Sequence, residues 1–166
     1  MRRVLVLLIV AGCGDKRVDT GAVSDADAEV LCENGCSYDV DCLAADLDAC
    51  IADCVDSSAG WVRHDALAAE QACIADLPCD QDPGVCGDRV KPLQVHRDFA
   101  TKCDMQLADC TSLVDCTVDF NPDDPSAGEL RFAAPNVIAE LSACLDGADC
   151  TARTDCITGV FDAYGI

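Results

Sequence analysis

Cys32-Glu33-Asn34-Gly35-Cys36 and Cys50-Ile51-Ala52-Asp53-Cys54 are two matching stretches, each with cysteines four residues apart. Residues at this spacing lie on one face of an α-helix. Two antiparallel helices carrying such pairs can be joined twice, Cys32 to Cys54 and Cys36 to Cys50. The spacing therefore predicts a helical hairpin with two disulfides, although the sequence alone leaves other pairings open.

A longer cysteine pattern occurs once in each half of the chain. The segment from Ala72 to Cys79, followed by Cys86, matches the segment from Ala143 to Cys150, followed by Cys156. This duplication predicts two related cysteine-rich helical modules, residues 25–90 and 91–166, with the disulfides confined within each module.

The upstream cysteines of the two modules can be aligned in two registers. In the first, Cys36 and Cys42 correspond to Cys110 and Cys116, and Cys32 corresponds to Cys103. In the second, Cys50 corresponds to Cys116, which places Phe120 opposite Cys54. The sequence does not decide between these registers.

Apolar residues recur at the helical period, as in Leu43, Leu47, Ile51 and Cys54, and no stretch alternates as a strand would. The predicted fold is therefore all-α. We expect Asn34-Gly35 to end the first helix and Ser37-Tyr38-Asp39 to form a turn. The expected helices cover residues 25–33, 40–55, 64–77, 92–108, 135–145 and 151–163, and residues 78–90 are expected to be a disulfide-linked loop.

The composition is acidic and poor in aromatic residues. The chain has 31 Asp and Glu against 11 Lys and Arg, and a net charge of −20. That charge repels nucleic acid, so no nucleic-acid partner is expected. With only 4% aromatic residues the core buries little area per residue, and disulfides are expected to compensate.

The N-terminus has the pattern of an export signal. Met1-Arg2-Arg3 and a short apolar run precede Val10-Ala11-Gly12-Cys13; the run is too short for a membrane span, which needs about 20 residues. Val10-Ala11-Gly12-Cys13 resembles the bacterial lipobox. The resemblance implies a signal peptide over residues 1–12, a diacylglyceryl thioether on Cys13, cleavage before Cys13 and acylation of the new amino terminus. Residues 13–24 then form the lipidated cysteine and a flexible tether.

Lipidation of Cys13 leaves an even number of cysteines, as a fully disulfide-bonded exported domain needs. With 15 cysteines in the chain, the other fourteen are the disulfide candidates. These are Cys32, Cys36, Cys42, Cys50, Cys54, Cys73, Cys79, Cys86, Cys103, Cys110, Cys116, Cys144, Cys150 and Cys156.

The whole chain resembles cysteine-rich helical lipoproteins of Gram-negative soil bacteria, on the lipobox and on repeats such as Ala143-Cys144-Leu145 and Asp155-Cys156-Ile157. The twin Cys-x3-Cys spacing is also similar to that of small mitochondrial intermembrane-space chaperones, a likeness of geometry and not of kinship. The lipobox resemblance implies anchoring to a lipid bilayer through acyl chains on Cys13. Since Gly14 replaces the inner-membrane retention aspartate, outer-membrane placement, on its periplasmic or surface face, is favoured over the inner membrane.

Candidate sites are few. Asp119, Asn121 and Asp123 supply oxygens at EF-hand-like spacing, but Asp124 and Leu130 stand where glycine and glutamate should be, so calcium ligation there is only weakly indicated. No Cys-x-x-Cys occurs, which argues against zinc, iron–sulfur and thioredoxin-like chemistry. No cofactor or metal is expected.

The remaining polar and aromatic candidates are expected to have surface or structural roles. His64, at the start of a helix, and His96, on a helix expected to be exposed, belong to no catalytic motif. Trp61 is expected to cover the core of the first module. The sequence therefore predicts a non-enzymatic binding or structural lipoprotein with an unknown protein or glycan partner; the alternative is an acidic calcium-binding lipoprotein.

Overall fold

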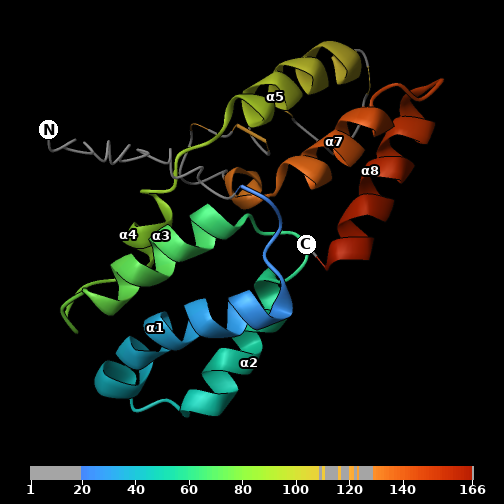
Figure 1. Ribbon diagram of the computed structural model, residues 1–166. Coiled ribbons are helices and arrows are strands. Elements are labelled where there is room, and N and C mark those ends of the chain that lie inside the picture. The colour runs from blue at the N-terminus through green and yellow to red at the C-terminus, as the bar shows by residue number, and fades with distance from the viewer. Residues whose placement is uncertain are drawn as a thin grey trace, which may run out of the picture.

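The computed structural model describes residues 20–108, 110, 116, 120–121, 123 and 129–165. Over these residues the fold is all-α with seven disulfides, as predicted, and two isolated bridges take the place of a sheet. No helix in the described ranges is long and apolar enough to cross a membrane. The elements are α1 (Asp25–Leu43), α2 (Leu47–Ser58), α3 (His64–Ala75), α4 (Gly84–Gly87), α5 (Gln94–Leu107), the 3-10 helix η2 (Glu129–Phe132), α7 (Pro135–Cys144) and α8 (Cys150–Tyr164) (Figure 1).

Helix α1 begins where the sequence predicts and ends much later. The Ser24 hydroxyl accepts the backbone N–H of Asp27 and caps the first turn. The helix then continues through Asn34-Gly35, so the predicted stop there is wrong. Gly35 serves packing instead, because a Cβ built on it would overlap Oε1 of the Gln71 side chain on α3. The missing side chain leaves room for the end of the Gln71 side chain against α1.

The break between α1 and α2 lies at residues 44–46, and the predicted turn at Ser37-Tyr38-Asp39 is helical. Ala44 adopts a left-handed conformation, φ 54°, and its backbone N–H is bonded to the carbonyl of Asp39. The Asp46 carboxylate then accepts the N–H of Ala49 at 2.9 Å, which caps α2. The predicted helix over residues 40–55 is therefore divided between two helices.

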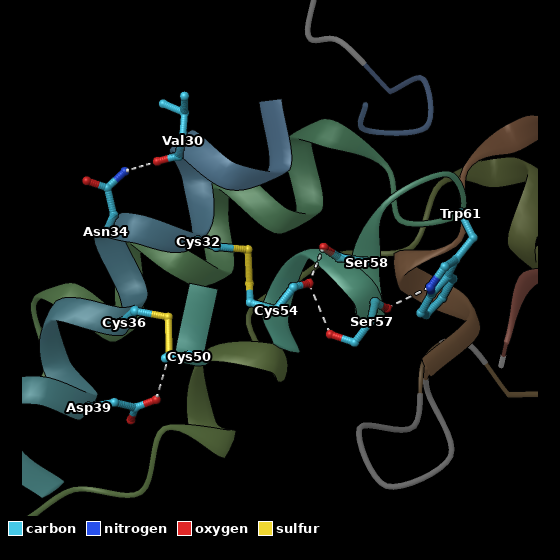
Figure 2. The surroundings of a disulfide bond; sticks show 10 residues. All are labelled: Val30, Cys32, Asn34, Cys36, Asp39, Cys50, Cys54, Ser57, Ser58 and Trp61. Atoms are coloured by element: carbon cyan, nitrogen blue, oxygen red, sulfur yellow. Dashed lines mark hydrogen bonds between the residues drawn. A yellow bond between two sulfur atoms is a disulfide. The ribbon is translucent and has the colours of Figure 1, made fainter. Parts of the chain in front are cut away.

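Helix α1 packs against both α2 and α3, and it carries the hairpin predicted from the cysteine spacing (Figure 1). Both expected bridges are present, Cys32–Cys54 and Cys36–Cys50, with Cα–Cα distances of 5.9 and 5.8 Å. Figure 2 shows the two bridges one helical turn apart along the α1–α2 seam. The two helices are thereby held together covalently.

The middle of the chain follows the sequence with small differences. Helix α3 begins at the predicted residue, while the predicted loop 78–90 contains the short helix α4. Pro92 lies ahead of α5 rather than in its first turn, since Leu93 is the extended residue at the helix start.

The second half of the chain builds the larger hydrophobic cluster. Pro135 begins α7, at a position whose backbone N–H has no partner within the helix, so proline costs no hydrogen bond there. Asp149 caps α8, because its carboxylate accepts the backbone N–H of Ala152. Helix α7 packs on both α5 and α8. Their buried residues form one cluster, which includes Phe99, Cys103, Leu107, Val137, Ile138, Leu141, Leu145 and Ile157.

Three stretches of chain, residues 21–23, residues 60–64 and the end of η2 with the residues that follow it, meet between the two halves. Val23 N–H is bonded to Val62 O at 2.8 Å, and Arg63 N–H to Phe132 O at 2.7 Å. Val23 is 1% exposed and belongs to the first hydrophobic cluster. The predicted tether, residues 13–24, is therefore too long at its C-terminal end, because burial and backbone pairing hold residues 21–23 in the domain.

Trp61 lies between the two hydrophobic clusters and packs against both. Its indole Nε1–H donates to the carbonyl of Ser57 at 2.7 Å (Figure 2). Trp61, which was predicted to cover the core of the first module, therefore also contacts the hydrophobic cluster of the second half.

Candidate functional site

The fourteen candidate cysteines form seven bridges, none of which crosses between residues 32–86 and 103–156. Cys36–Cys50, Cys42–Cys79 and Cys73–Cys86 in the first half recur as Cys103–Cys116, Cys110–Cys150 and Cys144–Cys156 in the second. This recurrence follows the second of the two sequence registers, in which Cys50 corresponds to Cys116. The fourth bridge of the first half, Cys32–Cys54, has no disulfide counterpart among these pairs.

Two of the sequence-predicted site residues fall outside the described ranges, the lipidation candidate Cys13 and the calcium candidate Asp119. The other two calcium candidates lie close together. Asn121 Oδ1 accepts the backbone N–H of Asp123 at 3.1 Å, and the Asp123 carboxylate accepts two hydrogen bonds from Arg97, at 2.8 and 3.2 Å. The Arg97 hydrogen bond, opposed by desolvation, lowers the pKa of Asp123. The Asp123 carboxylate is thus already paired with the guanidinium of Arg97.

Within the described ranges no group of three or more His, Cys, Asp or Glu side chains is placed to hold a metal ion.

His96 is buried, contrary to the surface role predicted for it. It is 1% exposed, on the inward face of α5, because both ring nitrogens find backbone partners. The N–H of Leu93 donates to Nδ1 at 2.8 Å, and Nε2 lies 2.9 Å from the carbonyl of Ala133. These contacts require a neutral ring with its proton on Nε2. Since neither nitrogen is free, the ring holds two backbone segments together.

Arg63 lies near His96 at the junction of the two halves. Its guanidinium donates to the carbonyl of Lys91 at 2.5 Å and forms an ion pair with Asp65 at 3.2 Å. Burial lowers the pKa of Arg63, and Asp65 partly opposes that shift. Desolvation is the main cause that lowers the pKa of His96, and the positive charge of Arg63 adds to it. Arg63 and His96 thus lie together in one buried polar group at this junction.

The accessible candidate site is a groove between α1 and α2, on the side away from α3. It consists of two hollows. One lies near the start of α1 and reaches Ile51 and Val55 on α2; the other lies near the end of α1 and reaches Val40 and Leu47. We call the two hollows together the α1–α2 groove. Their lining residues are Asp25, Ala26, Glu29, Asp48, Ile51, Ala52, Val55 and Asp56 in the first, and Glu33, Asn34, Ser37, Val40, Asp41 and Leu47 in the second.

The groove combines an apolar floor with acidic edges. Ile51 and Val55 also pack against the first hydrophobic cluster, whereas Val40 and Leu47 are 36% and 39% exposed. Six carboxylates line the hollows, and no lysine, arginine or histidine does. Sequence reasoning missed this site, because it divided the helices at the wrong residues. The detectable signal was the absence of any basic residue between Arg17 and Arg63.

Comparison with protein-family models, curated proteins and solved structures finds no match for this chain. The features on which a function can be argued are therefore the disulfide pattern, the acidic groove and the N-terminal sequence.

Proposed function

We propose that this chain is a lipid-anchored, extracytoplasmic module of the bacterial cell envelope, with a non-enzymatic binding or structural role. The observation that carries the proposal is the pairing of all fourteen cysteines other than Cys13. Disulfides persist in oxidising compartments, so the pairing favours export. It also leaves Cys13 as the single cysteine available for another modification.

The sequence around Cys13 supports a lipid anchor. A lipobox cysteine acquires three acyl chains, more than the two signals that stable membrane anchoring needs. Gly14 in place of aspartate favours the outer membrane over the inner.

A non-catalytic role is supported by what the reactive side chains already do. The bridged cysteines carry no thiolate, and both ring nitrogens of His96 are bonded to backbone groups. The accessible feature is instead an open groove with an apolar floor, a form suited to contact with a partner.

The direct experiment is metabolic fatty-acid labelling of the full chain in a Gram-negative host. Cys13→Ser should abolish labelling and leave the precursor uncleaved. As a matched control, Gly14→Asp should retain labelling and cleavage while moving the protein to the inner membrane. The lipid anchor would be refuted if the Cys13→Ser protein were cleaved and attached to the membrane in the same way as the parent protein.

The alternative, an acidic calcium-binding lipoprotein, has less support, because Asp123 is already bonded to Arg97. It is tested by thermal unfolding with and without millimolar calcium. A ligand that binds the folded state raises the melting temperature, so a marked rise would place this alternative first.

A further inference from the structure

We infer that the α1–α2 groove binds a basic amphipathic helix of a partner protein. This inference rests on the proposed binding role and specifies its site and the chemistry of the partner.

The groove has the form of a site for a third helix. Its walls are two antiparallel helices held at a constant separation by Cys32–Cys54 and Cys36–Cys50 (Figure 2). The α1 wall runs from Asp25 to Asp41, a length of about 24 Å at the rise of an α-helix. A helix of about 16 residues has this length. Since disulfides fix the two walls, little conformational freedom is lost on binding.

The apolar floor supplies the contact surface. Leu47, Ile51 and Val55 follow one another at four-residue intervals on α2, so they form a single stripe, and Val40 adds an apolar side chain from α1. A partner helix with apolar residues at positions i, i+3 or i+4, and i+7 would lay that face on the stripe. Burial of the exposed parts of Val40 and Leu47 would favour binding.

The negative charge of the groove walls favours a partner helix with positively charged residues on its polar face. Glu29 and Glu33 line the α1 side, and Asp48 and Asp56 line the α2 side. The segment from Asp25 to Ser58 contains ten Asp and Glu residues and no Lys, Arg or His. Lysine or arginine residues flanking the apolar face of a partner helix would meet carboxylates on both sides.

The same charges disfavour two other occupants. An anionic membrane surface is repelled by acidic side chains. A second copy docked groove to groove would place the carboxylates of one groove against those of the other, and like charges in contact are unfavourable. A basic helix is the occupant whose charge complements both walls.

The experiment measures binding of labelled synthetic peptides to the full chain in a zwitterionic detergent. The probe is a helical peptide of about 16 residues with leucines on one face and lysines flanking them. Two control peptides have the same length: one replaces every lysine by glutamate, and the other scrambles the sequence so that the leucines share no face. The protein variants are Glu29→Gln/Asp48→Asn in the groove and, as the matched control, Asp155→Asn/Asp162→Asn at exposed positions of α8.

The lysine peptide should bind, and the glutamate and scrambled peptides should bind at least about tenfold more weakly. Neutralising Glu29 and Asp48 should weaken binding about fivefold to tenfold, while the α8 variant binds as the parent does. Equal binding of the scrambled peptide, equal effects of the two variants, or no binding of the lysine peptide would overturn the inference. Self-association of the parent that becomes stronger in the groove variant, as the removal of like charges would make it, would assign the groove to a second copy and would overturn the inference as well.

The peptide result is separable from the anchoring result. Loss of lipidation in Cys13→Ser depends on the N-terminal sequence alone, so a groove that binds no peptide leaves the lipid anchor standing.

Discussion

The rings of Phe99 and Phe120 lie 5.6 Å apart between centroids at an interplanar angle of 58°, in the place that the Cys32–Cys54 bridge holds in the first half of the chain. Phe99 precedes Cys103 by four residues, as Cys32 precedes its neighbour Cys36. Phe120 stands opposite Cys54 in the register that the disulfides support. A tilted aromatic pair is a favourable contact, so the second half uses a non-covalent contact where the first uses a covalent one.

Truncation of Phe99 should therefore destabilise the second half strongly. Phe99→Ala removes a ring that is almost fully buried, and we expect the free energy of unfolding to fall by about 3–5 kcal/mol. Urea unfolding measures the change. Val95→Ala, at an exposed position of the same helix, is the control and should change stability by less than about 0.5 kcal/mol. Equal effects of the two variants would mean that the aromatic pair contributes nothing special.

Gly35 and Gln71 should be energetically coupled. Alanine is favoured over glycine in a helix by about 1 kcal/mol, but the new Cβ would meet the Gln71 side chain, which would have to move. Gly35→Ala should thus be more favourable by about 1 kcal/mol in a Gln71→Ala background than in the parent. A double-mutant cycle from urea unfolding measures this coupling, and strictly additive effects would contradict the contact between Gly35 and the Gln71 side chain.

Acid should destabilise the fold through His96. Burial, the largest cause, lowers the pKa of His96 in the folded state below its ordinary value of 6.5. The unfolded chain therefore binds a proton first, and stability is lost as the pH falls below 6.5, until the folded-state pKa is reached. The loss amounts to at most about 1.4 kcal/mol per pH unit.

The variant His96→Gln provides the comparison, since glutamine at this helix position can still accept the N–H of Leu93 without titrating. Urea unfolding between pH 7 and pH 5.5 should show a smaller slope for the variant than for the parent. Identical slopes would show that His96 is not the titrating group.

The Cys42–Cys79 bridge should contribute more to stability than the Cys73–Cys86 bridge. The Cys42–Cys79 bridge closes a loop of 37 residues and the Cys73–Cys86 bridge a loop of 13 residues. For loops of these lengths the chain-entropy model gives stabilisations of about 4 and 3 kcal/mol. The paired variants Cys42→Ser/Cys79→Ser and Cys73→Ser/Cys86→Ser should lower the free energy of unfolding in that order. Non-reducing peptide mapping should first show that the remaining bridges keep their partners; the reverse order with intact pairing would contradict the loop-size argument.

The helical hairpin could be predicted because its signal is local. Cysteines four residues apart share a helix face, and two such pairs favour the bridges that are observed, Cys32–Cys54 and Cys36–Cys50. The bounds of α1 could not be predicted, because Asn34-Gly35 is a helix stop in isolation. Only the position of the Gln71 side chain, distant in sequence, shows what occupies the space beside this glycine.

The sequence by itself determined the all-α class and the complete use of fourteen cysteines in disulfides, and it favoured the hairpin, because helical periodicity and cysteine spacing act over a few residues. The tertiary structure decided the register of the two halves, the burial of His96 and the position of the acidic groove. Each of these depends on which distant segments meet: Cys42 with Cys79, His96 with Ala133, and the wall of α1 with that of α2. Such contacts are set by the packing of whole helices, for which no short stretch of the chain carries a signal.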